Sequence, residues 1–263
     1  MSLTNKTIAN SYKDLLQMDN SNNGIDTSAK QVKDGEGTLS SLFLYDDGVS
    51  IKPVNDDSGT AFTVLSQDGS NLTLQVDTVN NLVRSNLNIV NTQYATFSVG
   101  NTESTNFVDD THHAITFSNA NYGLLTYPPA FGTGTDPATT FTTAEGNATR
   151  ASDLVPCLWY VCDDISIDAI KSIEGADTAT GDTTRMHLFS YDFTSGATSC
   201  LTNGALVAHN SDVTNAGSEQ PYLSTWTVDT AAVSAGKVLL AFFKSDSINS
   251  DYSLQVTVKY HLT

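Results

Sequence analysis

Cysteine is scarce in this 263-residue chain, and its number and spacing argue against stabilisation by disulfides. The three cysteines, Cys157, Cys162 and Cys200, are an odd number that does not fit a disulfide framework. Cys157 and Cys162 would face opposite sides of a continuous strand, so they could not pair there. A CxxxxC spacing without a second cysteine pair or a nearby histidine is also a poor zinc signal. We therefore expect buried free thiols and assembly in a reducing cytoplasm.

Positive charge and long hydrophobic runs are also sparse. Only 12 Lys and Arg residues stand against 29 Asp and Glu, which gives a net charge of −17, and the cations are spread along the whole chain. Without a basic cluster, a nucleic-acid partner is not expected. No apolar run reaches 18 residues, and the first 16 residues lack the apolar core of a signal peptide. We therefore expect no membrane partner.

The spacings that identify common metal sites are absent from the five histidines. His112 and His113 are adjacent, so on a strand their side chains would point to opposite faces. The other three lie in separate segments without the HExxH spacing of a zinc enzyme: His187, His209 and His261. The sequence therefore predicts no metal site.

Catalytic motifs are missing as well. Asp163, Asp164 and Asp168 fit turn and capping roles better than a carboxylate pair or a calcium site. The stretch "GTGTDP" lacks the Lys-Ser/Thr of a phosphate loop, and no GxSxG occurs. We expect no catalytic residue and no cofactor. The least favoured alternative is an enzyme, such as a glycan depolymerase that pairs Asp163 or Asp164 with Asp182.

What the chain does contain is alternation of apolar and polar residues, with Ser, Thr and Asn filling most polar positions. This pattern predicts an all-β fold. Between residues 31 and 104, short strands are separated by turns such as "KDGEGT" and "QDGSN". The hairpin at 62–83 places Leu72, Leu74 and Val76 on one face. Because an isolated hairpin is at best marginally stable in water, we expect another copy of the chain to cover this face.

Residues 105–263 are richer in aromatic side chains and contain both tryptophans. The nearly apolar "PCLWYVC" (156–162) is typical of a strand buried on both faces, and "YSLQVTVKYHL" (252–262) of a strand with one core face. About eight such strands separated by long loops predict a jelly-roll β-sandwich. Four aromatic residues near loops could bind a sugar, although core or subunit packing is the favoured role: Tyr122, Tyr127, Phe131 and Trp226.

The N-terminal residues 4–18 have the spacing of a short amphipathic helix. Its apolar stripe consists of Ile8, Tyr12, Leu15 and Leu16, and "DNSNNG" ends it. Such a short helix is not stable alone, so it would dock on its own domain or on a partner. The sequence thus predicts three regions: an N-terminal arm or anchor (1–30), a β-rich stem or collar (31–104) and a jelly-roll head (105–263).

Longer stretches carry a family resemblance. They are "NSYKDLLQMDNSNNGIDTSAKQVKDGEGTLSSLFL", "LWYVCDDISIDAIKSIEGADTATGDTTRMHLFSYDF" and "DSINSDYSLQVTVKYHL". These stretches, which belong to the N-terminal and C-terminal parts of the chain, resemble virion structural proteins of tailed bacteriophages, especially marine ones. The resemblance implies a homotrimer with a small intertwined β stem and a jelly-roll head like that of tumour necrosis factor (TNF-like).

The resemblance also implies a role on the virion surface. The stem is short, which favours a capsid decoration, cement or head fibre protein attached by its N-terminal half to the major capsid protein or to a tail adaptor. Ile8, Tyr12, Leu15 and Leu16 would then anchor the chain to the virion, and Leu72, Leu74 and Val76 would contact the other subunits. The alternative is a tail fibre or receptor-binding protein that recognises a host surface glycan.

Overall fold

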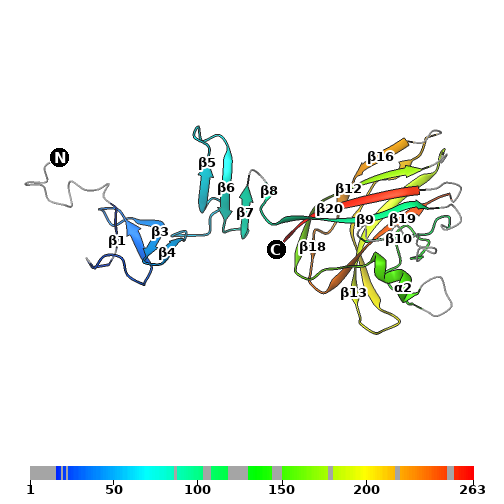
Figure 1. The fold of residues 1–263 in the computed structure, drawn as a ribbon, viewed down its shortest axis with the longest axis horizontal. Coiled ribbons are helices and arrows are strands. Elements are labelled where there is room, and N and C mark those ends of the chain that lie inside the picture. Colours follow the sequence, from blue (N-terminus) through cyan, green and yellow to red (C-terminus); the bar gives the residue numbers. More distant parts are fainter. Residues whose placement is uncertain are drawn as a thin grey trace, which may run out of the picture. The chain divides into compact units, whose positions relative to one another are not determined.

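The chain forms two compact units, Met1–Asn91 and Thr92–Thr263. The computed structural model describes residues 16–18, 20–21, 23–85, 88–102, 108–117, 130–143, 150–176, 180–216, 220–247 and 252–263. These segments are almost entirely strands and loops, so the predicted all-β class is confirmed (Figure 1). The first unit ends before residue 104, the predicted end of the stem, because strand β9 (Thr92–Thr102) pairs with the last strand of the second unit.

The first unit contains two small antiparallel sheets, each with its strands in chain order. The first sheet consists of β1 (Gln17–Met18), β2 (Lys30–Lys33), β3 (Leu39–Tyr45) and β4 (Gly48–Ile51). The second consists of β5 (Phe62–Leu65), β6 (Leu72–Asp77), β7 (Leu82–Ser85) and β8 (Asn88–Ile89).

The turns of these sheets follow from aspartates and glycines in the sequence. Asp34 accepts hydrogen bonds from the backbone N–H groups of Glu36 and Thr38, at 2.9 and 2.8 Å. Gly37, at φ +89°, then adopts a left-handed conformation that glycine tolerates without strain. The turn at "QDGSN" uses Asp68 and Gly69 in the same way. These local bonds explain why the turn motifs could be recognised from the sequence.

The predicted helix over 4–18 is wrong at its end. Gln17 and Met18 form strand β1, whose partners in β2 are Lys33 and Val32. Pairing with β2 supplies the backbone hydrogen bonds that a helix end would leave unsatisfied. The rest of the predicted helix, residues 4–15, lies outside the described residues.

The second unit is a β-sandwich with jelly-roll strand order. One sheet has the order β16-β12-β20-β9 and the other β10-β19-β13-β14-β17. If β17 and the other two-residue strands are left out and the remaining eight strands are numbered 1 to 8 along the chain, these orders read 6-3-8-1 and 2-7-4-5, which is the arrangement of a jelly roll. The bounds are β10 (His113–Ile115), β12 (Ile165–Ala176), β13 (Thr183–Phe193), β14 (Leu201–His209), β16 (Gln220–Thr225), β19 (Lys237–Ser245) and β20 (Tyr252–Leu262). Short strands flank them: β11 (Trp159–Tyr160), β15 (Val213–Thr214), β17 (Thr227–Val228) and β18 (Ala232–Val233).

The two sheets enclose one hydrophobic core, to which all eight strands except β16 contribute buried residues. Ile170, Val256 and Phe97 come from one sheet and Met186 and Leu188 from the other, and all are almost fully buried. The core face predicted for 252–262 is confirmed: its residues are buried from Tyr252 to Val258, and Tyr260 and Leu262 are partly buried against the same core. A bulge in β12 at residue 168 shifts the register of its pairing with β20.

A second core covers the other face of the β10-β19-β13-β14 sheet. Phe131 and Phe141, from the segment before the helical turn, stack at 4.4 Å between ring centroids, and Phe131 lies 4.8 Å from Phe242 of β19. Leu154 of α2 (Ala151–Leu154) completes the cover. The sheet is therefore buried on both faces, whereas the β16-β12-β20-β9 sheet is buried on one.

The stretch 156–162 is not the continuous buried strand that its apolar composition predicts. Residues Val155–Cys157 form a 3₁₀ turn, η2, and only Trp159–Tyr160 pair as β11. Pro156 explains the difference, because proline fits the first turn of a helix and cannot donate to a sheet. The cysteines are free as expected, but only Cys157 and Cys200 are buried. Cys162 is exposed, which corrects the prediction of buried thiols.

A buried carboxyl group joins the two layers of the sandwich. Glu174 of β12 is 1% exposed, and its two oxygens lie 2.7 and 2.8 Å from the hydroxyl of Thr184 in β13. Burial raises the pKa of Glu174 to about 7, although the Thr184 hydrogen bond acts in the opposite direction. The group is therefore held largely protonated at mildly acidic pH.

This carboxyl makes stability depend on pH. Between its ordinary pKa of 4.5 and its folded pKa of about 7, the unfolded chain releases the proton while the folded chain keeps it. The free energy of unfolding should therefore fall by up to about 3 kcal/mol as pH rises through this window. Urea denaturation followed by tryptophan fluorescence should show this fall, and Glu174→Gln should abolish it. The exposed control Asp163→Asn should retain it; an unchanged profile in Glu174→Gln would contradict the assignment.

Candidate functional site

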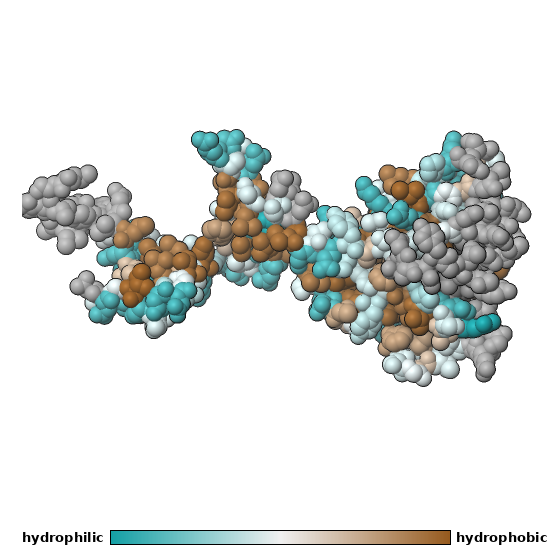
Figure 2. Space-filling model, in the orientation of Figure 1, coloured by the Kyte–Doolittle hydropathy of each residue, from teal (hydrophilic) through white to brown (hydrophobic). Residues whose placement is uncertain are grey.

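The β5–β8 sheet presents an exposed apolar face. Its register places Phe62, Val76 and Val83 in one row, and Val64 and Leu74 in the next. We call these five residues together with Leu72 the hairpin face. Phe62, Val64 and Val83 are 38%, 39% and 41% exposed, and hydrophobic side chains crowd this part of the surface in Figure 2. The opposite face carries polar residues, such as Thr63, Gln75 and Arg84, in a single row.

The β1–β4 sheet has a similar exposed apolar face. Leu42 pairs with Ile51 and Leu44 with Val49, so these four side chains share one side of the sheet. Val49 and Ile51 are exposed. Among the described residues of the first unit, Val32 is the only buried hydrophobic residue. Neither small sheet therefore has a core of its own in the described part of the chain.

A third uncovered surface is the outer face of the β16-β12-β20-β9 sheet, which we call the outer sheet face. Its apolar members are Tyr94 (66% exposed), Ile173 (47%) and Leu223 (68%), and Ile173 is paired directly with Leu223. Lys171 and Lys259 lie among them, at the edge of a hollow of about 430 Å³. No carboxylate is among the residues that line this hollow.

The predicted site residues fall into two groups. Ile8, Tyr12 and Leu15 lie outside the described residues, and Leu16 is 67% exposed just before β1. Leu72, Leu74 and Val76 lie half-buried on the hairpin face, next to Phe62, Val64 and Val83, which sequence reasoning missed. Phe62 and Val64 alternate with polar residues as Leu74 and Val76 do on the other side of the turn. This cross-strand pattern could have predicted that they share the hairpin face. The roles of both groups stay predictions.

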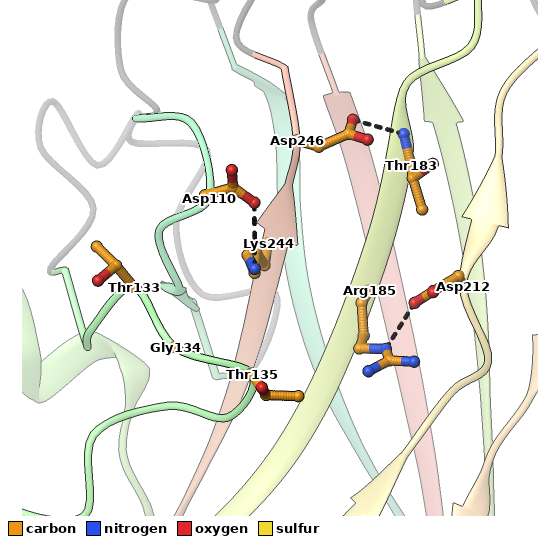
Figure 3. A pocket seen from close by; sticks show the side chains of 9 residues that line it. All are labelled: Asp110, Thr133, Gly134, Thr135, Thr183, Arg185, Asp212, Lys244 and Asp246. Atoms are coloured by element: carbon orange, nitrogen blue, oxygen red, sulfur yellow. Dashed lines mark hydrogen bonds and ion pairs between the residues drawn. The ribbon is translucent and has the colours of Figure 1, made fainter.

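A polar cavity of about 540 Å³ lies on the other sheet of the sandwich (Figure 3). Its floor is formed by Arg185 of β13 and Lys244 of β19, which are directly paired across the two strands. Residues 133–135 form one wall, and the rim includes Asp110, Asp212 and Asp246. Sequence reasoning missed this site, because Arg185 and Lys244 are 59 positions apart and only the strand register joins them.

Three ionic or hydrogen-bonded contacts order the cavity lining. Arg185 Nε lies 2.6 Å from Asp212 Oδ1, and Lys244 Nζ lies 3.2 Å from Asp110 Oδ1. Asp246 Oδ1 accepts a hydrogen bond from the backbone N–H of Thr183 at 2.7 Å. Two cations and three carboxylates are thus interleaved, with both cations on adjacent central strands.

Two buried histidines hold the wall of the cavity in place. The rings of His112 and His187 meet edge to face at 5.1 Å. His112 Nδ1 donates to the Gly132 carbonyl at 3.2 Å, and His187 Nε2 lies 3.4 Å from Asp136 Oδ1. Burial lowers the pKa of His112 to about 4 and that of His187 to about 3, so both rings are neutral at physiological pH. The two histidines belong to separate segments of the chain, and tertiary structure alone brings their rings together.

The carboxylates weighed as catalytic groups are not brought together. Asp163 and Asp164 precede the start of β12, whose Ile165 pairs with Leu262. Asp182 lies at the opposite end, where its carboxylate contacts the hydroxyl of Tyr252 at 3.3 Å. The two ends of a strand this long are on the order of 30 Å apart, whereas glycoside hydrolysis requires carboxyl groups within about 10 Å. Asp168 instead bonds His261 Nδ1 at 2.8 Å.

Two of the four aromatic residues considered for sugar binding are buried. Phe131 and Trp226 are 1% and 5% exposed, so they belong to the cores. Tyr122 and Tyr127 lie outside the described residues. Within the described segments, no group of three His, Cys, Asp or Glu side chains has a geometry that could hold a metal ion. No helix in that same part of the chain is long and apolar enough to span a membrane.

Comparison with known proteins gives little. No family model matches the chain, and no curated protein matches it. Among solved structures, an aminopeptidase from the marine sediment archaeon Thaumarchaeota archaeon aligns with 6% identity and a TM-score of 0.31. The alignment covers 72% of this chain and 40% of that one. A likeness this small carries no argument about fold or function.

The hairpin face offers a direct test of whether another chain covers it. Val64→Asp places a charge on the apolar face, whereas the control Thr73→Asp places one on the polar face of the same hairpin. If the face is covered, Val64→Asp should weaken self-association at least tenfold and the control should not, because only a desolvated charge is costly. Sedimentation velocity over a concentration series measures this. Equal behaviour of the two variants would mean that the hairpin face is exposed to water.

Proposed function

We propose that this chain is a non-enzymatic structural protein of a phage virion, which works as a homotrimer that decorates or cements the capsid. The observation that carries the proposal is the set of three uncovered apolar sheet faces, two of them in a unit with almost no core among its described residues. A protein that functions by assembly, rather than by chemistry, accounts for such surfaces. The jelly-roll head is compatible with this role, and the resemblance of the sequence stretches supports it.

Burial of the exposed apolar faces would favour self-association. Burial of apolar surface contributes about 25 cal/mol per Å², or about 1.5–3 kcal/mol for a fully buried Val, Leu, Ile or Phe side chain. Covering Phe62, Val64 and Val83 alone would therefore contribute several kcal/mol per chain, before the cost of association is subtracted. Pairing would also protect short exposed strands from uncontrolled edge contacts.

Charge favours a cyclic assembly over a face-to-face dimer. The outer sheet face carries Lys171 and Lys259, with no acidic residue around its hollow. Placing this face against itself would bring like charges together. Contact with a different, acidic surface of the next copy avoids that repulsion and suits a chain with net charge −17. Such heterologous contacts close into rings, of which the trimer is the smallest with more than two members.

The assembly can be tested at the outer sheet face. The wild-type protein should sediment at three times the 28.1 kDa mass of the chain. Leu223→Asp should shift the distribution towards monomer, because it introduces a charge into an apolar contact. Val155→Asp is a matched control, since Val155 is 64% exposed on the helical turn and lies outside this face. A stable wild-type monomer at micromolar concentration would overturn the trimer.

Attachment to the virion is tested separately. Purified protein should bind shells assembled from the major capsid protein of the same genome, and the bound copies should appear on the shell surface by immunogold labelling. Leu15→Asp, in the predicted anchor stripe, should reduce binding at least tenfold without changing the trimer, and Asn10→Asp should not. Labelling confined to the tail would reject decoration of the capsid and favour the alternative, a receptor-binding tail fibre. The polar cavity is the observation that favours that alternative.

A further inference from the structure

The polar cavity is built for a ligand of a definite chemistry, and its floor is the first indication. Arg185 and Lys244 face each other across β13 and β19. Like charges placed directly opposite in a sheet are destabilising. The chain has only 12 Lys and Arg residues in total, so two of them at this position are conspicuous. Their carboxylate partners, Asp212 and Asp110, offset part of the repulsion.

The guanidinium of Arg185 is only partly used. Its Nε is paired with Asp212, whereas neither Nη group has a partner among the described residues. In Figure 3 a dashed line joins the guanidinium of Arg185 to Asp212, and no other dashed line reaches it from the residues drawn. Two parallel N–H groups of a guanidinium match the two oxygens of a carboxylate. The free edge of Arg185 is therefore suited to a carboxylate group of a ligand.

The other lining residues indicate which groups the rest of the ligand must carry. Asp246 uses one carboxylate oxygen for the Thr183 backbone and has a second acceptor, and the wall at 133–135 adds two threonines and the backbone of Gly134. Carboxylate acceptors require donors, which hydroxyl groups supply. All nine lining residues are polar, charged or glycine, so an apolar ligand finds no matching surface. Three carboxylates on the rim disfavour a multiply charged anion such as phosphate.

The site is also preorganised. Arg185 and Lys244 sit on central strands of a sheet that is packed on both faces. The wall at 133–135 lies between Gly132 and Asp136, the two residues contacted by His112 and His187. The volume of about 540 Å³ lies within the range of small-molecule sites, about 300–1,000 Å³. A cavity that does not need to rearrange loses less free energy when a ligand enters.

We propose that the polar cavity binds a carboxylated sugar, with the sugar carboxylate on the Nη groups of Arg185 beside Lys244 and the sugar hydroxyls on Asp246 and the threonines of the wall. Uronic and sialic acids share this chemistry. The inference does not depend on the trimer or on capsid decoration, because each chain contains the whole cavity.

The test is a ligand titration of the full-length protein by nuclear magnetic resonance. D-glucuronate and N-acetylneuraminate are the probes, and a preference for one identifies the type of sugar acid. D-glucose lacks the carboxylate, acetate lacks the hydroxyls, and inorganic phosphate tests simple anion binding. At least one sugar acid should bind saturably and at least tenfold more tightly than the three comparison compounds. Failure of both sugar acids to bind, or phosphate binding of equal strength, would overturn the proposal.

Variants locate the binding on Arg185. Arg185→Lys keeps the positive charge but removes the two parallel N–H groups of the guanidinium, so affinity for the sugar acid should fall at least tenfold. Arg150→Lys, outside the cavity, should leave the affinity unchanged. Thr135→Glu changes an exposed wall residue and supplies an internal carboxylate to Arg185, so it should abolish binding even if Arg185→Lys proves unstable. Unaltered affinity in Thr135→Glu, with its fold verified by its spectrum, would place the ligand elsewhere and reject the site.

Discussion

An apolar face on a β-sheet has to be covered, and this requirement organises the whole chain. Each Å² left in water forgoes about 25 cal/mol, and a sheet has two faces on which alternate residues lie. In the jelly roll, the two sheets cover each other, and the segment around Phe131 and Phe141 covers one outer face as well. The two small sheets of the first unit have no such cover among the described residues. The same physical rule thus yields closed cores in the second unit, which leaves one outer sheet face uncovered, and little core among the described residues of the first.

Much of this could be predicted from the sequence, because alternation and turn residues are local signals. The face that contains Leu72, Leu74 and Val76, and the core face of 252–262, follow from a period of two. The failures arise where local composition misleads. The apolar stretch 156–162 is not a strand, because Pro156 starts a helical turn, and Gln17–Met18 join a sheet through their partners in β2. The bulge at residue 168 gives no signal in the sequence pattern.

The candidate sites also differ in whether the sequence could predict them. The hairpin face could be anticipated, because its residues alternate along neighbouring strands. The outer sheet face could not, because Tyr94, Ile173 and Leu223 come from strands that are distant in the sequence. The polar cavity could not, because Arg185, Lys244 and the 133–135 wall become neighbours only through the register of β13 and β19 and through a segment folded over the sheet. His112 and His187, which support that wall, are likewise joined by tertiary structure alone. A site that is assembled from distant segments cannot be recognised from a single sequence.

The position of β20 has a consequence for biosynthesis. This strand lies between β12 and β9, and its residue His261 is paired with Thr92, the first residue of its unit. On the ribosome, β9 emerges early and must wait for almost the entire head to be translated before its neighbour exists. Contacts this remote in sequence slow folding and prolong the exposure of unpaired strands. A chain that is truncated before residue 252 would therefore lack β20 and leave β9 and β12 unpaired on that side. Its exposed strand edges would promote aggregation, and it would not form a smaller sandwich.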